Sequence, residues 1–415
     1  MRKNVLKVAT IATGIVSVSF LSSCHNRDNM MSDDAKSKME RTITFENIIT
    51  PKEFSQSGTF KGIKPGESVS ITFSAGKTQR LMFTTMFANS YDWFFASKQP
   101  GIKLFDDNGN AITGDVSSQL TVWDNGTKDE ITGTPEDKVI ETRGNVLKVR
   151  ELMKAELSYN ESTSVFTLKI TNTSEGKLAG ANLRDKTQNL TPFSDGVWVV
   201  SNYDGQKLLS EKPFFTVKEK TNPEITDVAQ MGDITKLYNK VKANTGIITG
   251  LSPALVVVYT GEKNPLYELN KKDQGLGLKE LSQKGDFSKL QESLKKDKSI
   301  KEVYIAGNTP VAPGQKMMAT YKVETGAKVA YATMFGFSND WFYTNEQNIS
   351  AEHKGDVTNR TSLFDSGTGV DQFPGAGNRQ ALFGGTPEKE NNPIQKVGNK
   401  FPVPAVANTL KITIN

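Results

Sequence analysis

The sequence contains one series of motifs twice, and this duplication limits the folds open to the chain more than any other feature. The matched segments are Thr85-Met86-Phe87 with Thr333-Met334-Phe335, Asp92-Trp93-Phe94 with Asp340-Trp341-Phe342, residues 123–127 with residues 364–368, and residues 166–172 with residues 408–415. The first two pairs are separated by 248 residues and the third by 241, so one loop differs in length. Because 415 residues suffice for at least two cores, we expect two copies of one domain.

Apolar residues alternate with polar residues in several segments, and this period of two indicates β-strands with one buried face. The apolar positions are Val69, Ile71 and Phe73, then Phe166, Leu168 and Ile170, and finally Leu410, Ile412 and Ile414. No segment shows the alternation of strands and helices that builds a parallel sheet. We therefore predict a mainly β fold of tandem antiparallel β-sandwich units with a few short helices.

A smaller repeat lies between the two copies. Residues 232–237 resemble residues 285–290, and each segment follows an apolar run typical of a strand, at 197–200 and at 255–259. Each segment is predicted to be a short helix capped by its Asp. This strand-helix piece follows the motifs in copy one and precedes them in copy two.

The repeats also predict the domain boundaries. We expect the first β-sandwich at residues 41–176 and the second at residues 177–415, including the strand-helix insert. The sequence leaves open whether residues 177–245 pack on the first unit, because the insert has a different place in each copy.

The start of the chain has the pattern of an exported lipoprotein. Arg2, Lys3 and Lys7 precede an apolar stretch at residues 8–20, and Leu21-Ser22-Ser23-Cys24 resembles the lipobox of bacterial lipoproteins. We expect a signal peptide at residues 1–23, lipidation of Cys24, and a flexible tether at residues 24–40. The predicted location is the bacterial cell envelope, at the outer membrane, with the face left open.

The supply of reactive side chains is small, and it excludes several classes of site. The chain has one Cys and two His, His25 and His353, which excludes an internal disulfide and a His-rich or multi-thiolate metal site. The formal net charge of +5 falls to +2 once the signal peptide is removed, since that segment has three basic residues and no acid. We therefore expect no nucleic-acid partner and no enzymatic activity.

Both copies place carboxylates beside bulky apolar residues and tight turns. A carboxylate in such surroundings needs backbone N–H groups, an Arg or a metal as its partner, and the sequence leaves these alternatives open. Trp-Phe pairs are themselves typical of a packed β-core. Ca²⁺ takes six to eight oxygen ligands, which makes these carboxylates candidate metal ligands. The candidates are Asp92 and Asp340 before Trp-Phe, Asp124 and Asp365 in the repeated Asp-x-Gly-Thr, and Asp129 and Asp371 shortly after it.

The motifs resemble the spondin N-terminal domain family in its bacterial form. The resemblance rests on Thr-Met-Phe-x-x-Ser-Asn-Asp-Trp-Phe at 333–342, Phe-Asp-Ser-Gly-Thr at 364–368 and Phe-Pro-Gly-Ala-Gly-Asn-Arg-Gln at 373–380. It covers about 165 residues of copy two and a shorter stretch of copy one. The resemblance implies a β-sandwich similar to a C2 domain, Ca²⁺ bound by acidic loop residues, and a role in extracellular adhesion.

The chain departs from the family pattern at one position. The family has an acid four residues after the Asp of Asp-x-Gly-Thr, where this chain has Lys128 in copy one and Gly369 in copy two. Asp129 or Asp371 would have to replace that acid, and copy two is expected to hold the better Ca²⁺ site.

These observations favour a binding function. We expect a cell-envelope lipoprotein with spondin-like domains that acts in adhesion or partner binding, with Ca²⁺ as its cofactor. Its partners would be the membrane, through Cys24, and an extracellular or envelope protein or glycan. Two alternatives stay open: a structural accessory subunit of an outer-membrane complex that binds no metal, and a hydrolase built on carboxylates.

Overall fold

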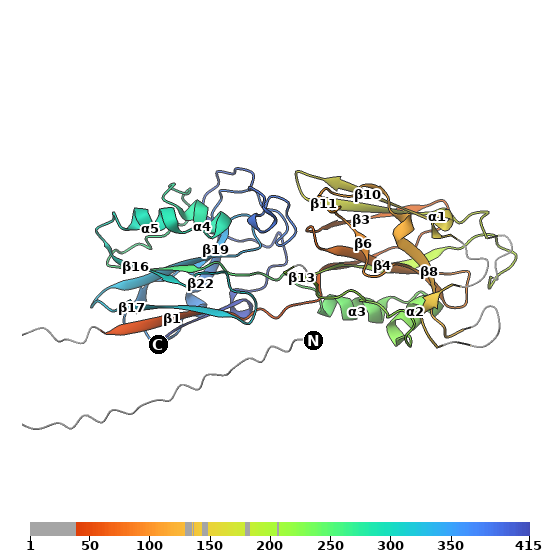
Figure 1. The fold of residues 1–415 in the computed structure, drawn as a ribbon, viewed down its shortest axis with the longest axis horizontal. Coiled ribbons are helices and arrows are strands. Elements are labelled where there is room, and N and C mark those ends of the chain that lie inside the picture. The colour runs from red at the N-terminus through yellow and green to blue at the C-terminus, as the bar shows by residue number, and fades with distance from the viewer. Residues whose placement is uncertain (1–38, 129–134, 136, 143–147, 179–182, 206) are drawn as a thin grey trace, which may run out of the picture. The chain divides into compact units, whose positions relative to one another are not determined.

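The computed structural model describes residues 39–128, 135, 137–142, 148–178, 183–205 and 207–415 (Figure 1). The expected signal peptide, Cys24, the tether up to residue 38, and Asp129 lie outside the described residues. The described residues form antiparallel sheets with five short α-helices, which confirms the predicted mainly β fold class. None of the helices in these ranges is long and apolar enough to cross a membrane.

The second β-sandwich packs a seven-stranded sheet against a four-stranded sheet. The larger sheet has the order β16-β15-β18-β19-β22-β23 with β20 paired to β18, and the smaller has the order β17-β1-β24-β21. The strands are β1 (Glu40–Asn47), β15 (Ala254–Tyr259), β16 (Ile300–Ala306), β17 (Lys316–Lys322), β18 (Lys328–Met334), β19 (Trp341–Asn345), β20 (Ile349–Ser350), β21 (Gly355–Asp356), β22 (Thr361–Asp365), β23 (Gln395–Lys396) and β24 (Leu410–Ile414). The core between the sheets includes Ile43, Phe45, Tyr331, Trp341 and Ile412.

The first β-sandwich has the same two layers. Its larger sheet has the order β2-β12-β4-β5-β8-β9 with β6 paired to β4, and its smaller sheet has the order β3-β11-β10-β7. The strands are β2 (Phe54–Phe60), β3 (Ser68–Ser74), β4 (Arg80–Phe87), β5 (Trp93–Ser97), β6 (Ile102–Lys103), β7 (Gly114–Asp115), β8 (Leu120–Asp124), β9 (Ile140–Glu141), β10 (Met153–Asn160), β11 (Val165–Asn172) and β12 (Phe193–Ser201). Helix α1 (Val149–Leu152) precedes β10, and β13 (Tyr203–Asp204) pairs with β14 (Lys207–Leu208).

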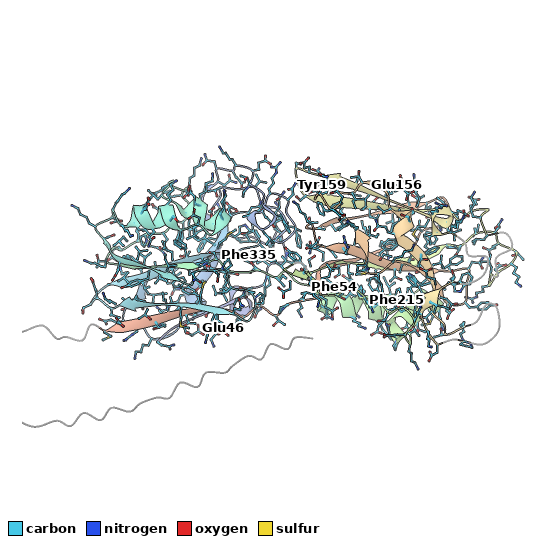
Figure 2. The ribbon with its side chains drawn as sticks, viewed as in Figure 1. Glu46, Phe54, Glu156, Tyr159, Phe215 and Phe335 are labelled. Atoms are coloured by element: carbon cyan, nitrogen blue, oxygen red, sulfur yellow. The ribbon has the colours of Figure 1, made fainter. Side chains whose placement is uncertain are left out.

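A pair of helices covers the outer face of each seven-stranded sheet (Figure 1). Helices α2 (Pro223–Met231) and α3 (Thr235–Ala243) cover the first sheet, and α4 (Leu278–Lys284) and α5 (Ser288–Leu294) cover the second. Phe54 and Phe215, labelled in Figure 2, belong to the apolar cluster under α2 and α3. The Asp residues expected to cap helices stand just before α3 and α5, where Asp233 and Asp286 accept the N–H groups of Thr235 and Ser288.

The sheets divide the chain differently from the expected boundaries. Strand β1 lies in the second sandwich, paired with β17 and β24, although residues 41–47 are expected in the first. Strand β12 pairs with β2 and β4, and α2 and α3 pack on those strands, so this part of residues 177–245 belongs to the first sandwich. Alternating apolar residues fit any half-buried strand, and the local pattern therefore does not specify which sheet a strand joins.

The two sandwiches have the same spatial arrangement of strands, but the chain begins at a different strand in each. In the smaller sheets, β17-β1-β24-β21 corresponds to β3-β11-β10-β7, so β1 occupies the position of β11. Asn47 and Asn172 support this match, because each side-chain amide donates to two main-chain carbonyls just outside the strand. The expected match of residues 166–172 with residues 408–415 is therefore wrong, since β24 occupies the position of β10. Copy one is thus a circular permutation of copy two.

Candidate metal centre

The repeated Asp residues of copy two come from two neighbouring connections at one end of the seven-stranded sheet. Asp340 stands directly before β19, Asp365 is the last residue of β22, and Asp371 lies in the loop after it. Strands β19 and β22 pair with Trp341 opposite Asp365, which brings the first two carboxylates side by side. The Trp-Phe pair beside Asp340 is buried in the core, as a packed β-structure requires.

Asp340 is fully buried, and its carboxylate ties the two connections together. Its Oδ2 accepts hydrogen bonds from the Ser366 hydroxyl (2.8 Å), the Thr368 N–H (2.7 Å) and hydroxyl (3.0 Å), and the Gly369 N–H (2.9 Å). Its Oδ1 accepts none from any residue that the structure describes. A buried carboxylate oxygen without a donor is costly, and a cation at that oxygen would remove the cost.

The glycines of the loop explain the Asp-x-Gly-Thr pattern. Gly367 has φ +67°, and a Cβ there would lie 2.3 Å from the Asn392 carbonyl oxygen, so only Gly fits this turn. The Gly367 N–H donates to the Asp365 Oδ1 at 2.7 Å. A side chain at Gly369 would meet Pro387 at 2.7 Å, and the bare backbone there can donate to Asp340. The turn therefore positions Asp365 while directing N–H groups at Asp340.

A helix braces this loop from outside the motif. Gln283, in the last turn of α4, donates from its side-chain amide to the Thr368 carbonyl (3.2 Å) and hydroxyl (3.0 Å). In copy one, Gln230 of α2 donates to the Thr127 hydroxyl at 2.7 Å. Sequence reasoning missed both residues, but a signal exists, because each Gln stands two residues before the Gly-Asp of the smaller repeat.

Three carboxylates converge in copy two. One oxygen each from Asp340, Asp365 and Asp371 lies within 4.8 Å of the others. Burial, followed by the charges of Asp340 and Asp371, raises the pKa of Asp365 to about 8. Burial, followed by the charge of Asp340, raises the pKa of Asp371 to about 7, and burial also raises the pKa of Asp340. The raised pKa values reflect the unfavourable free energy of placing three negative charges close together in a site that is partly shielded from water.

The nearby basic residues offset only part of the negative charge of the cluster. Arg379 pairs with Glu388, and Lys396 pairs with Glu346 at 2.8 Å. Lys400 donates to the main-chain carbonyl of Asp371 at 3.4 Å, and its charge lowers the pKa of Asp371 by less than burial and the charge of Asp340 raise it. The charge of Glu390 adds to the repulsion, since it further raises the pKa values of Asp365 and Asp371. The electrostatics of the site therefore favour an added cation.

The set of ligand atoms fits a hard divalent cation. All three side chains offer carboxylate oxygens, which Ca²⁺ prefers, and among the described residues no His or Cys belongs to the cluster. Two Asp lie on the ends of paired strands, and the third lies in a loop that Asp340 anchors, so the ligands are held before a cation binds. Asp371, one of the two residues expected to replace the acid absent at Gly369, belongs to this cluster.

Copy one repeats the buried Asp and the hydrogen bonds that it accepts from the following loop. Asp92 is fully buried, and its Oδ2 accepts from the Thr127 N–H (2.7 Å) and hydroxyl (2.7 Å) and from the Lys128 N–H (2.8 Å). Asp124 lies opposite Trp93 and accepts the Gly126 N–H at 2.7 Å. Burial raises the pKa of Asp92, while the hydrogen bonds from Thr127 and Lys128, followed by the charge of Lys128, lower it.

The third carboxylate of copy one is not among the described residues. Asp129 lies outside them, and so does Glu130, which stands six residues after Asp124 as Asp371 stands six after Asp365. The described part of copy one therefore presents two of the six expected ligands, Asp92 and Asp124, in the arrangement of Asp340 and Asp365.

The sequence matches no protein-family model, and no curated protein matches it either. The site is therefore interpreted from its own residues.

Proposed function

We propose that this protein is a lipid-anchored component of the bacterial cell envelope that binds an extracellular protein or glycan through spondin-like sandwiches, with Ca²⁺ held by Asp340, Asp365 and Asp371. The observation that carries the proposal is the convergence of these three carboxylates within 4.8 Å. The lipobox pattern before Cys24 and the resemblance to the spondin family support the location and the binding role.

A bound Ca²⁺ would change the electrostatics of this end of the sandwich. Three carboxylates with little compensating charge repel one another, and a divalent ion turns the repulsion into attraction. The Oδ1 of Asp340 has lone pairs available for the ion, while its Oδ2 stays bonded to the loop. Binding would therefore fix the loop after β22 without breaking the hydrogen bonds that shape it.

The loop that Ca²⁺ would fix is suited to partner binding. Residues 366–394 connect β22 to β23 and carry the 373–380 motif, with no strand and one short 3₁₀ turn (Ala381–Phe383) among them. Recognition residues usually lie on loops held by a rigid scaffold. Ordering this loop before the partner arrives lowers the entropy cost of binding, which would make adhesion dependent on Ca²⁺.

Calorimetric titration and thermal unfolding test the metal. The purified full chain, treated with EDTA and then titrated with CaCl₂, should bind Ca²⁺ and unfold at a higher temperature. Ca²⁺ at a hundred times its dissociation constant stabilises a protein by about 2.7 kcal/mol, which raises the melting temperature of a domain of 150–250 residues by roughly 5–10 °C. An unchanged melting temperature at millimolar Ca²⁺ would contradict the proposal.

Matched variants locate the site. Asp371→Asn should abolish the shift that copy two contributes, because it removes one charge and one ligand. Asp124→Asn, at the position of copy one that corresponds to Asp365, should leave that shift in place. The opposite pattern would place the site in copy one and refute the assignment.

An adhesion assay tests the binding role. Cells that display the full chain should adhere to a surface coated with extracellular-matrix extract in Ca²⁺, and lose adhesion in EDTA. Cells displaying Asp371→Asn should adhere weakly in both conditions. Equal adhesion by cells without the protein would argue against this role and leave the metal site standing.

A further inference from the structure

The second sandwich takes one of its inner strands from the other end of the chain. Strand β1 lies between β17 and β24 and runs antiparallel to both, from Glu40 opposite Lys322 to Asn47 opposite Leu410. Figure 1 shows β1, at the red end of the colour scale, among the blue strands of this sandwich, and Figure 2 labels Glu46 on it. Without β1, both neighbouring strands would expose an unpaired edge toward each other.

The position in the sheet between β17 and β24, which β1 fills and which we call the slot, buries the side chain of every second residue of β1. Ile43, Phe45 and Asn47 point into the core and are fully buried. The Phe45 ring meets the Tyr331 ring edge-on, with centroids 5.3 Å apart. The Asn47 amide donates to the carbonyls of Thr249 (2.9 Å) and Val311 (3.3 Å). The slot is thus matched to one particular extended sequence, which the chain itself supplies.

The first sandwich fills the same position in a different way. There β11 follows β10 directly through the four-residue turn 161–164, so the strand is held by a hairpin. In the second sandwich no such hairpin joins β1 to β24. Strand β1 is joined only through residues 48–53 to β2, which belongs to the first sandwich. Its place in the sheet is therefore maintained by hydrogen bonds and packing rather than by a tight turn.

We propose that β1 is an exchangeable donor strand, and that the slot between β17 and β24 accepts the Glu40–Asn47 strand of a second copy of this chain. A strand from another molecule has the same sequence and makes the same contacts, which makes such an exchange a low-cost route to association. The linker of six residues spans at most roughly 20 Å, and short hinge loops favour exchange between molecules. Copies gathered on one membrane surface would meet at high effective concentration.

Two single-Cys chains test the exchange directly. Thr44 lies opposite Thr413 in the antiparallel pair, and both side chains are half-buried on the outer face of the sheet. Directly opposite residues in such a pair are about 4.5–5.5 Å apart between Cα atoms, which permits a disulfide. Full chains carrying Thr44→Cys and Thr413→Cys separately, both with Cys24→Ser, are mixed, warmed below the melting temperature and oxidised.

The expected result is a covalent heterodimer, because a disulfide between these positions requires the strand of one chain in the slot of the other. The matched control replaces Thr413→Cys by Thr171→Cys, on β11 of the first sandwich, where β1 has no partner. At least a tenfold higher yield of heterodimer than in the control supports exchange. An equal yield overturns the proposal.

A second experiment avoids any question of folding. A site for a specific protease is inserted into residues 48–53 of the full chain, which is folded first and cleaved afterwards. A fluorescent peptide of residues 39–49 should then replace the cleaved strand, whereas the same peptide with Phe45→Asp should not. Failure of the first peptide to bind, or equal binding of the two, refutes a sequence-matched slot.

Discussion

We expect the Asp365→Asn variant to lose the part of the pH dependence of stability above pH 5 that Asp365 contributes to the metal-free second sandwich. The wild-type carboxyl is buried beside Asp340 and Asp371, and these surroundings raise its pKa to about 8. An amide has the same shape and no charge, so the variant removes the titration while keeping the volume of the side chain.

The sign and size of the effect follow from proton linkage. Between pH 4 and pH 8 the native state keeps a proton on Asp365 that the unfolded chain has released. The free energy of unfolding therefore falls as the pH rises through this range and levels off above it. A pKa near 8 against an ordinary value near 4 corresponds to at most roughly 5 kcal/mol. Part of that repulsion is shared with Asp371, whose pKa is also raised, so the two contributions do not add.

Denaturation of the full chain in EDTA at several pH values measures the effect. Trp341 is buried opposite Asp365, and the other three Trp belong to the first sandwich, so ¹⁹F NMR of fluorotryptophan-labelled protein follows each sandwich separately. The wild type should lose several kcal/mol between pH 5 and pH 8, and the variant should be more stable at pH 8. Parallel pH profiles for the two proteins would refute the reasoning. Saturating Ca²⁺ should flatten the wild-type profile, because the ion replaces the protons.

Three further substitutions have expected outcomes. Phe45→Ala should destabilise the second sandwich by about 3–5 kcal/mol, because it leaves a cavity between the sheets; chemical denaturation measures the loss. Gly367→Ala should destabilise it by at least about 1–2 kcal/mol and weaken Ca²⁺ binding, since the added Cβ would lie 2.3 Å from a carbonyl at φ +67°. Gln283→Ala should cost about 1–3 kcal/mol by removing the two buried hydrogen bonds that Gln283 donates to Thr368, each contributing about 0.5–1.5 kcal/mol, and should lower the Ca²⁺ affinity measured by calorimetry.

Each substitution has a matched control. Met318→Ala changes a half-exposed residue of the same sheet and should have little effect. Gly66→Ala has φ +82° but open space around it, so it should cost less than Gly367→Ala. Gln230→Ala removes the corresponding amide of copy one and should leave Ca²⁺ binding by copy two unchanged. Equal effects of a substitution and its control would contradict the corresponding prediction.

The strands of this protein are predictable from sequence, but their partners are not. The alternating residues at 69–73, 166–170 and 410–414 lie in β3, β11 and β24, with the apolar side chains of β11 and β24 buried as expected. The same alternation in residues 40–47 is compatible with either sandwich, because burial of one face does not identify the neighbouring strands. Asn47 is the residue that indicates the neighbouring strands, since a polar residue at the end of an apolar face needs specific hydrogen-bond partners.

Two of the three carboxylates in the site were predictable from the sequence, because they lie at the ends of neighbouring strands. The Asp-Trp-Phe and Asp-x-Gly-Thr motifs place Asp340 and Asp365 side by side because β19 and β22 are neighbours. The position of Asp371 depends on the path of a loop, which no periodicity describes, and Gln283 reaches the site from a helix far away in sequence. Contacts between residues so far apart in the sequence become known only from the three-dimensional structure.

The comparison of the two copies separates the structural role of the repeated Asp from a role in metal binding. Asp92 and Asp340 accept the same hydrogen bonds, from a Thr N–H, a Thr hydroxyl and the next N–H, and both are fully buried. Because these bonds need no ion, the repeated motif accounts for loop closure in both copies. A cation becomes favourable only where a third carboxylate adds charge that the loop donors do not neutralise, as Asp371 does. The motif alone therefore predicts closure of the loop, and a third carboxylate such as Asp371 beside it is needed to predict Ca²⁺ binding.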